Sequence, residues 1–68
     1  MRTGKLKWFD ADKGYGFIVP DDGGEDVFVR GAAMTEAGMQ GSAEGTPLSF
    51  NVERTAEGLQ ATDLQRTE

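Results

Sequence analysis

The segment from Lys13 to Val19, KGYGFIV, constrains the fold most, because it has the composition of a β-strand and carries two aromatic rings at fixed parity. Successive side chains of a strand point to opposite faces, so Tyr15 and Phe17 share one face while Ile18 and two glycines share the other. If Ile18 points into the core, both rings lie on the outer surface of the sheet. Taken alone, the segment also permits the reverse arrangement, in which the rings are core residues.

A second strand, from Asp26 to Arg30, favours the outward arrangement of the rings. Its alternation places Val27 and Val29 on one face and Phe28 on the other, together with the two charged residues. Because β-branched residues belong in a core and charged residues in solvent, Phe28 lies outside by parity alone. A third exposed ring indicates an aromatic surface, and such a surface with nearby cations can stack the bases of a single-stranded nucleic acid.

The length of 68 residues indicates one domain, residues 1–68, in which residues 65–68 are expected to form a frayed polar tail. The chain has no cysteine and no histidine, so we expect neither a metal site nor another cofactor, and most catalytic chemistry is excluded. It has no apolar run of signal-peptide or membrane-spanning length. We therefore expect a cytoplasmic monomer with no membrane partner and no small-molecule substrate.

The net charge of −5 argues against a nucleic-acid partner only when the chain is taken as a whole. Basic residues are in excess in residues 1–20, whereas the acidic excess lies in residues 21–68. The basic excess thus coincides with the aromatic segment. A local positive patch matters more for phosphate binding than the total charge does.

Five segments have strand composition, and turn residues separate them. The expected strands are residues 4–10, 13–20, 26–30, 48–53 and 59–64. Residues 31–46 are expected to form a long loop, in which Ala32–Ala37 has the composition of a short helical turn. In the fourth strand, alternation predicts that Phe50 points inward and Ser49 outward. No helix is long enough to cross over a sheet, so we expect an all-β fold, a five-stranded antiparallel barrel whose closure removes exposed edges.

Two adjacent rings, Trp8 and Phe9, break the alternation of the first strand, in which Leu6 is expected inside and Lys7 outside. Neighbouring residues cannot both follow a period of two, so either a bulge occurs here or one ring is buried and the other exposed. Trp8 suits the role of a core anchor as well as that of a surface ring. The adjacent Lys7 favours exposure of Trp8.

Three motifs in this order and spacing resemble the bacterial cold-shock proteins: KWF at residues 7–9, KGYGFI at 13–18 and DVFV at 26–29. RNA-recognition-motif domains carry a string similar to the second motif, but they need two amphipathic helices for which this chain has no room. The resemblance covers nearly the whole chain. It implies a barrel of the oligonucleotide-binding type that binds single-stranded RNA and DNA, keeps transcripts from forming stable hairpins and has no enzymatic activity.

The resemblance also implies which residues bind the nucleic acid. They are Lys7, Trp8, Phe9, Lys13, Tyr15, Phe17, Phe28 and Arg30, with the rings stacking on bases and the cations beside the backbone. Arg30 stands where the family usually has histidine, and Gly31 and Met39 stand at positions that are often aromatic. We therefore expect a base-stacking surface that is shortened at one end.

Two other classes of function compete with this interpretation. A protein-interaction barrel could receive a peptide on its exposed rings, as aromatic grooves do for proline-rich ligands. The cations Lys7, Lys13 and Arg30 favour a nucleic acid, because a peptide groove has no general need for them. An enzyme is disfavoured, because no carboxylate lies in an apolar setting that would raise its pKa.

Overall fold

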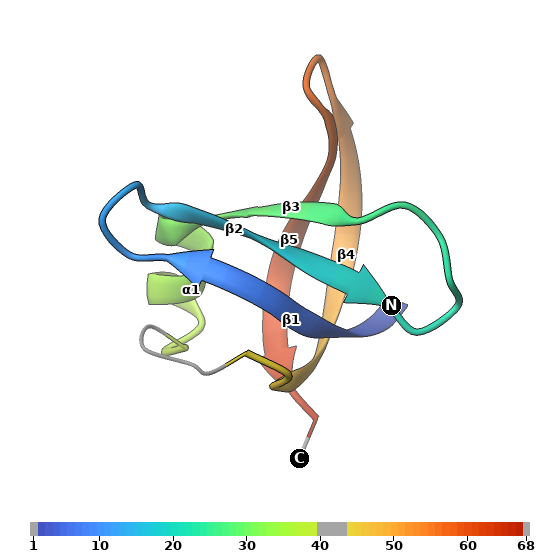
Figure 1. The fold of residues 1–68 in the computed structure, drawn as a ribbon, viewed down its shortest axis with the longest axis horizontal. Coiled ribbons are helices and arrows are strands. Elements are labelled where there is room, and N and C mark those ends of the chain that lie inside the picture. Colours follow the sequence, from blue (N-terminus) through green and yellow to red (C-terminus); the bar gives the residue numbers. More distant parts are fainter. Residues whose placement is uncertain (1, 40–43, 68) are drawn as a thin grey trace.

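The computed structural model describes residues 2–39 and 44–67 of the chain. Within them, five strands and one helix follow one another as β1 (Arg2–Asp10), β2 (Tyr15–Pro20), β3 (Val27–Arg30), α1 (Gly31–Glu36), β4 (Pro47–Thr55) and β5 (Gly58–Arg66). The strands form a closed sheet in the order β1-β2-β3-β5-β4, with β4 paired back to β1. Figure 1 shows β1, β2 and β3 running together across the view, while β4 and β5 cross behind them and project as a hairpin at the top.

The predicted all-β, five-stranded fold is confirmed, but the prediction that every pair of strands is antiparallel is wrong. β3 and β5 pair in parallel, with Phe28 opposite Gln60, whereas the other four pairs are antiparallel. The reason is geometric. Strand directions cannot alternate all the way around a closed ring that has an odd number of strands, so at least one neighbouring pair must be parallel.

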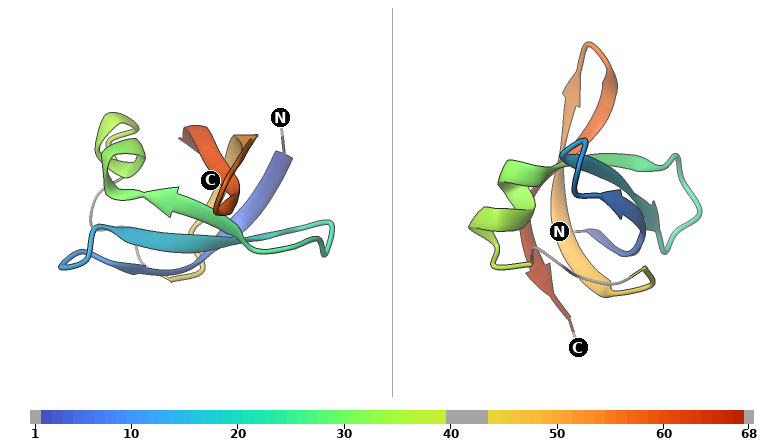
Figure 2. Two further views of the ribbon diagram at one scale, coloured as in Figure 1. Left: turned by 90° about the horizontal axis from the view of Figure 1, so that it is seen from above. Right: turned by 60° about the vertical axis from the view of Figure 1, so that its left-hand side comes forward.

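The expected long loop of residues 31–46 begins with a helix. α1 packs against β3 and β5 and buries Met34, which is 1% exposed. Figure 2 shows α1 to one side of the sheet, next to the end of β3. The helix ends where Gly38 adopts φ +70°, a conformation that a glycine accepts without steric cost. Residues 40–43 of the expected loop lie outside the described residues.

The core is built from the inward faces of the strands, as the alternation predicts. Ile18, Val27, Val29 and Phe50 are each 0% exposed. Ser49, predicted to point outward into solvent, is only 8% exposed. The pairing of β4 with β5 has a register shift between Ser49 and Asn51, and the three consecutive residues Leu48, Ser49 and Phe50 are all buried, so strict alternation is interrupted here.

Both ends of the chain are paired further than the sequence predicts. β1 begins at Arg2, which pairs with Phe50, rather than at Gly4. β5 continues beyond Leu64 through two residues of the expected frayed tail, and Arg66 pairs with Leu48. No helix among the described residues is long and apolar enough to cross a membrane.

Candidate nucleic-acid interface

Four rings form one contiguous surface on the outside of β1, β2 and β3, which we call the aromatic platform. Its members are Trp8, Tyr15, Phe17 and Phe28. The ring centroids of Trp8 and Phe17 are 5.3 Å apart, and those of Phe17 and Phe28 are 5.7 Å apart. Tyr15 stacks on Phe28 with an interplanar angle of 27° and a centroid distance of 5.5 Å. Trp8 is 37% exposed and the other three rings are half-buried, so the platform presents ring surface to solvent.

Strand register explains why these rings meet. Phe17 of β2 is paired with Trp8 of β1 on one side and with Phe28 of β3 on the other, so all three side chains share the outer face. Leu6 points inward and has the same parity as Trp8. A register shift between Leu6 and Trp8 reverses that parity and turns Trp8 outward. The predicted bulge is therefore present.

The structure does not bring Phe9 onto the aromatic platform. Phe9 is paired with Gly16 and packs against the core. A Cβ atom at Gly16 would collide with the carbonyl oxygen of Trp8 and would lie 2.8 Å from Cδ1 of Phe9. Gly16 is thus required because the backbone of Trp8 and Phe9 in β1 approaches it too closely to leave room for a side chain. Of the predicted site residues, Phe9 supports the platform from the inner side of the sheet.

Two predicted cations, Lys13 and Arg30, lie at one end of the aromatic platform. Arg30 is paired with Tyr15, and its guanidinium carbon lies 5.5 Å from the ring centroid of Phe28, in the range of a cation–π contact. Lys13 lies in the turn between β1 and β2. Across residues 2–39 and 44–67, neither side chain forms an ion pair with a carboxylate. Both cations are therefore open to an anionic ligand.

Asp10, which sequence reasoning did not place in the site, orders the turn that carries Lys13. Its Oδ1 accepts hydrogen bonds from the backbone N–H groups of Asp12 at 3.0 Å and Lys13 at 3.1 Å. The N–H of Gly14 donates to the Asp10 carbonyl oxygen at 2.8 Å. An aspartate three residues before the lysine in a turn is a recognisable Asx signal, so the sequence contained this information.

The predicted basic excess in residues 1–20 is largely paired with acidic residues. The loop Asp21–Asp26 between β2 and β3, which we call the acidic loop, lies along β1. Lys7 Nζ lies 2.9 Å from Asp26 Oδ2, and the side chains of Lys5 and Arg2 pair with Asp21 and Asp22. These contacts join segments far apart in sequence, so counting charges along the chain could not find them.

The acidic loop has a defined local structure. The backbone N–H of Gly24 donates to Asp22 Oδ1 at 3.0 Å. This hydrogen bond, together with the nearby Arg2 guanidinium, holds the pKa of Asp22 below its usual range. Asp22 therefore carries its negative charge at neutral pH.

The expected shortened end of the platform needs correction at Met39. This side chain is 1% exposed and belongs to the core, so it offers no surface for stacking. Gly31 begins α1 and donates from its N–H to the carbonyl oxygen of Gly14 at 2.7 Å. A Cβ atom at Gly31 would lie 3.1 Å from that oxygen. Gly31 thus allows α1 to approach the turn that carries Lys13.

Comparison with known proteins identifies the family. The family described as the 'Cold-shock' DNA-binding domain matches residues 2–67. The chain belongs to the cold-shock domain family. The cold shock-like protein CspG of Shewanella violacea is 48% identical over 62 residues, which cover 91% of this chain and 89% of that protein. Cold shock protein CspA of Rhizobium meliloti is 44% identical over 67 residues, covering 97% of each chain. Cold shock protein CspC of Bacillus subtilis is 44% identical over 66 residues, covering 97% of this chain and 98% of that protein.

The resemblance recognised from the three sequence motifs is therefore confirmed. The match extends over nearly all of this cold-shock domain, including the strands that carry the aromatic platform. The domain is thus a member of a nucleic-acid-binding family, and its four platform rings lie on the outer face of β1, β2 and β3, with Arg30 beside Phe28.

Proposed function

We propose that this cold-shock domain binds single-stranded RNA and DNA by stacking unpaired bases on the aromatic platform, and that it thereby keeps strands from pairing. The observation that carries the proposal is the contiguous group of four rings, with neighbouring centroids 5.3 to 6.4 Å apart, beside two cations that have no carboxylate partner among the described residues. The sheet that supports it is a small barrel of the oligonucleotide-binding type.

Stacking supplies the affinity in this proposal. Each base that stacks on an aromatic side chain contributes about 1–3 kcal/mol and does so for any base, because every base has a flat π-face. The exposed Trp8 gives the platform its most accessible ring. A base inside a duplex is already stacked on both sides and cannot lie on the platform. The interface therefore selects unpaired strands and holds them open, which is the basis of the proposed RNA-chaperone activity.

The charged residues hold the backbone. Lys13 and Arg30 are placed to contact phosphates at one end of the platform, and Arg30 can also stack its planar guanidinium on a base. Lys7 lies beside Trp8 but already contacts Asp26, so its contribution depends on leaving that partner. Phe9, which is paired with Gly16 and packs against the core, acts indirectly by supporting the strand that carries Trp8. One chain supplies all these residues, so the proposed activity does not require an oligomer.

A protein-interaction module that uses the same rings is the second candidate. The two open cations at the end of the platform favour the nucleic acid, because a phosphodiester backbone needs them and a peptide groove does not. The test uses the intrinsic fluorescence of Trp8, the one tryptophan in the chain. We expect quenching by an unstructured oligonucleotide and none by a duplex of matched length. Equal quenching by both nucleic acids, or none by either, contradicts the proposed function.

A further inference from the structure

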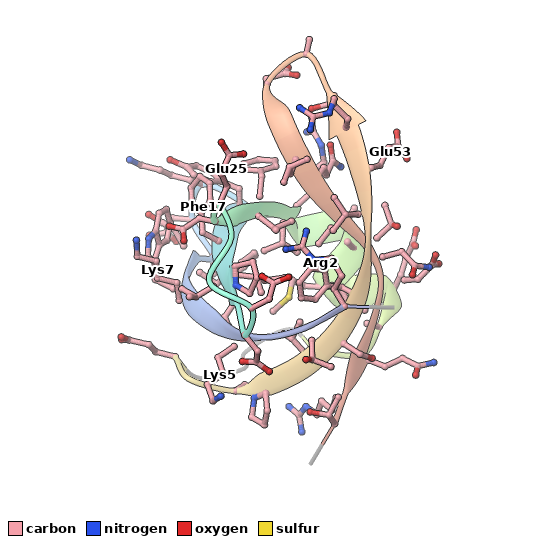
Figure 3. All side chains as sticks on the ribbon, turned by 90° about the vertical axis from the view of Figure 1, so that its right-hand side faces the viewer. Arg2, Lys5, Lys7, Phe17, Glu25 and Glu53 are labelled. Carbon is pink, nitrogen blue, oxygen red and sulfur yellow. The ribbon has the colours of Figure 1, made fainter. Side chains whose placement is uncertain are left out.

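Three ion pairs connect β1 to the acidic loop. Their nitrogen-to-oxygen distances are 3.3 Å for Arg2 and Asp22, 3.4 Å for Lys5 and Asp21, and 2.9 Å for Lys7 and Asp26. Figure 3 shows the loop at the front of the view, with the labels of Arg2, Lys5 and Lys7 around it. Every cation that β1 carries up to the aromatic platform is therefore paired.

These pairs do little for the stability of the fold. The side chains remain exposed, by 50% for Lys7 and 39% for Asp26 in the shortest pair, and exposed ion pairs contribute about 0–1 kcal/mol each. Their larger effect is on the local charge. Lys7 directly precedes Trp8, and Lys5 is paired in register with the exposed Val19, so both cations border the platform face.

We propose that the acidic loop is a specificity element, in which Asp21, Asp22 and Asp26 neutralise the β1 cations and so suppress binding to double-stranded nucleic acid. This inference rests on the proposed binding of single strands. It assigns to these aspartates a role in rejecting the wrong ligand. Lys13 and Arg30, which form no ion pair with a carboxylate among the described residues, lie at the end of the platform where α1 begins.

The physical reason is that the two ligands depend differently on cations. A duplex offers phosphates but no free base faces, so its affinity for this surface is almost entirely electrostatic, with log affinity falling by about 0.9 per contact for each decade of salt. For a single strand, log affinity falls by only about 0.7 per contact for each decade of salt, and stacking of its bases on the rings adds affinity that does not depend on cations. Pairing the cations with aspartates therefore weakens the binding of a duplex more than it weakens the binding of a single strand. Specificity improves by penalising the competitor.

The test replaces two of the three aspartates. The variant Asp21→Asn/Asp26→Asn frees Lys5 and Lys7 without changing side-chain size, and leaves Asp22 in place because its carboxylate also accepts the Gly24 N–H. The control is Glu53→Gln/Glu57→Gln, which changes the net charge equally. Both glutamates are exposed on the β4–β5 hairpin, and Figure 3 shows Glu53 on the opposite side of the molecule from Phe17 and Lys7.

The measurements are the affinities of wild type and both variants for a duplex and for an unstructured single strand, each over a range of salt. At about 0.1 M salt we expect the aspartate variant to gain about tenfold or more in duplex affinity, with the log–log salt slope steeper by up to about 1.8. Its affinity for the single strand should also rise, but the factor of that gain should be about 2–3 times smaller than the factor for the duplex. The control should change duplex affinity by less than about twofold, because neither glutamate forms an ion pair with a cation of β1 or of the platform among the described residues.

Each outcome is decisive for one of the two proposals. Duplex affinity that is unchanged in the aspartate variant, or equally increased in the control, overturns the specificity role of the acidic loop. A wild-type protein that does not bind the single strand contradicts the proposed function, and duplex binding by the variant still reports on the loop. Circular dichroism confirms that both variants are folded, since losing exposed pairs costs about 0–1 kcal/mol each.

Discussion

Replacing Phe17 by alanine separates binding from stability at the centre of the aromatic platform. The Phe17 ring has three ring neighbours, with centroids at 5.3 Å for Trp8, 5.7 Å for Phe28 and 6.4 Å for Tyr15. Its loss removes one stacking partner, which should cost about 1–3 kcal/mol of binding free energy, or about 5- to 150-fold in affinity. The ring is half-buried, so the lost ring–ring contacts should lower the free energy of unfolding by about 1–2 kcal/mol.

The length of the chain sets its unfolding entropy, which relates this loss of stability to a decrease in melting temperature. A 68-residue domain has an unfolding entropy of about 0.14 kcal/mol/K, so 1–2 kcal/mol corresponds to a decrease of about 7–14 °C. Phe50→Ala is the matched control, because it removes the same side chain from a site that is 0% exposed. There we expect a loss of about 3–5 kcal/mol, which is a large part of the about 3–10 kcal/mol available to a domain of this length.

The assay pairs thermal unfolding, followed by far-ultraviolet circular dichroism, with the anisotropy of a labelled single-stranded oligonucleotide. Phe17→Ala should stay folded at 25 °C and bind at least about fivefold more weakly than wild type. Phe50→Ala should melt about 20 °C or more below wild type. The assignment of Phe17 to the binding surface is refuted if Phe17→Ala unfolds like Phe50→Ala, or if it stays folded and binds with wild-type affinity.

Two further predictions follow from the contacts around the aromatic platform. The first concerns salt, and it assumes that Lys13 and Arg30 each neutralise one phosphate while Lys7 stays paired with Asp26. A plot of log single-strand affinity against log salt concentration should then have a slope of about −1.4. A slope of about −2 or steeper would show that Lys7 leaves Asp26 in the complex. Gly31→Ala should lower the melting temperature by about 7 °C or more, because its Cβ would press on the Gly14 backbone at 3.1 Å. Gly24→Ala is the control, since its Cβ would meet only side-chain ends that can move, and equal melting of the two variants would show that the contact at Gly14 is harmless.

Alternation along the strands was enough to predict which of these residues face the core and which rings lie on the outer face of the sheet. The parity of Ile18, Val27 and Val29 placed them inside, and all three are fully buried. The same parity placed Phe17 and Phe28 outside, where they meet in the aromatic platform. This works because the period of two is a property of the extended backbone itself, so local sequence decides which face each side chain occupies.

The break in alternation at Trp8 and Phe9 was only partly predictable. Two adjacent rings require either a bulge or a split between core and surface, and the structure has both, with Phe9 inside over Gly16 and Trp8 outside. The sequence left the choice open because either ring is large enough to anchor a core. The pairing of β1 with β2 decided it, since the register shift after Leu6 turns Trp8 outward and places Phe9 opposite the inward-facing Gly16.

The sequence by itself determined the number of strands, the family and most of the inward and outward faces, because these depend on local periodicity and short motifs. The buried Ser49 and the split between Trp8 and Phe9 are the exceptions. The tertiary structure alone decided which strands pair in parallel, that Met39 belongs to the core, and that Asp21 and Asp26 reach across to the lysines of β1. Each of these depends on the path of a loop through space. Contacts between segments about 20 residues apart form only when the closed sheet brings the segments together, and no local pattern in the chain encodes that path.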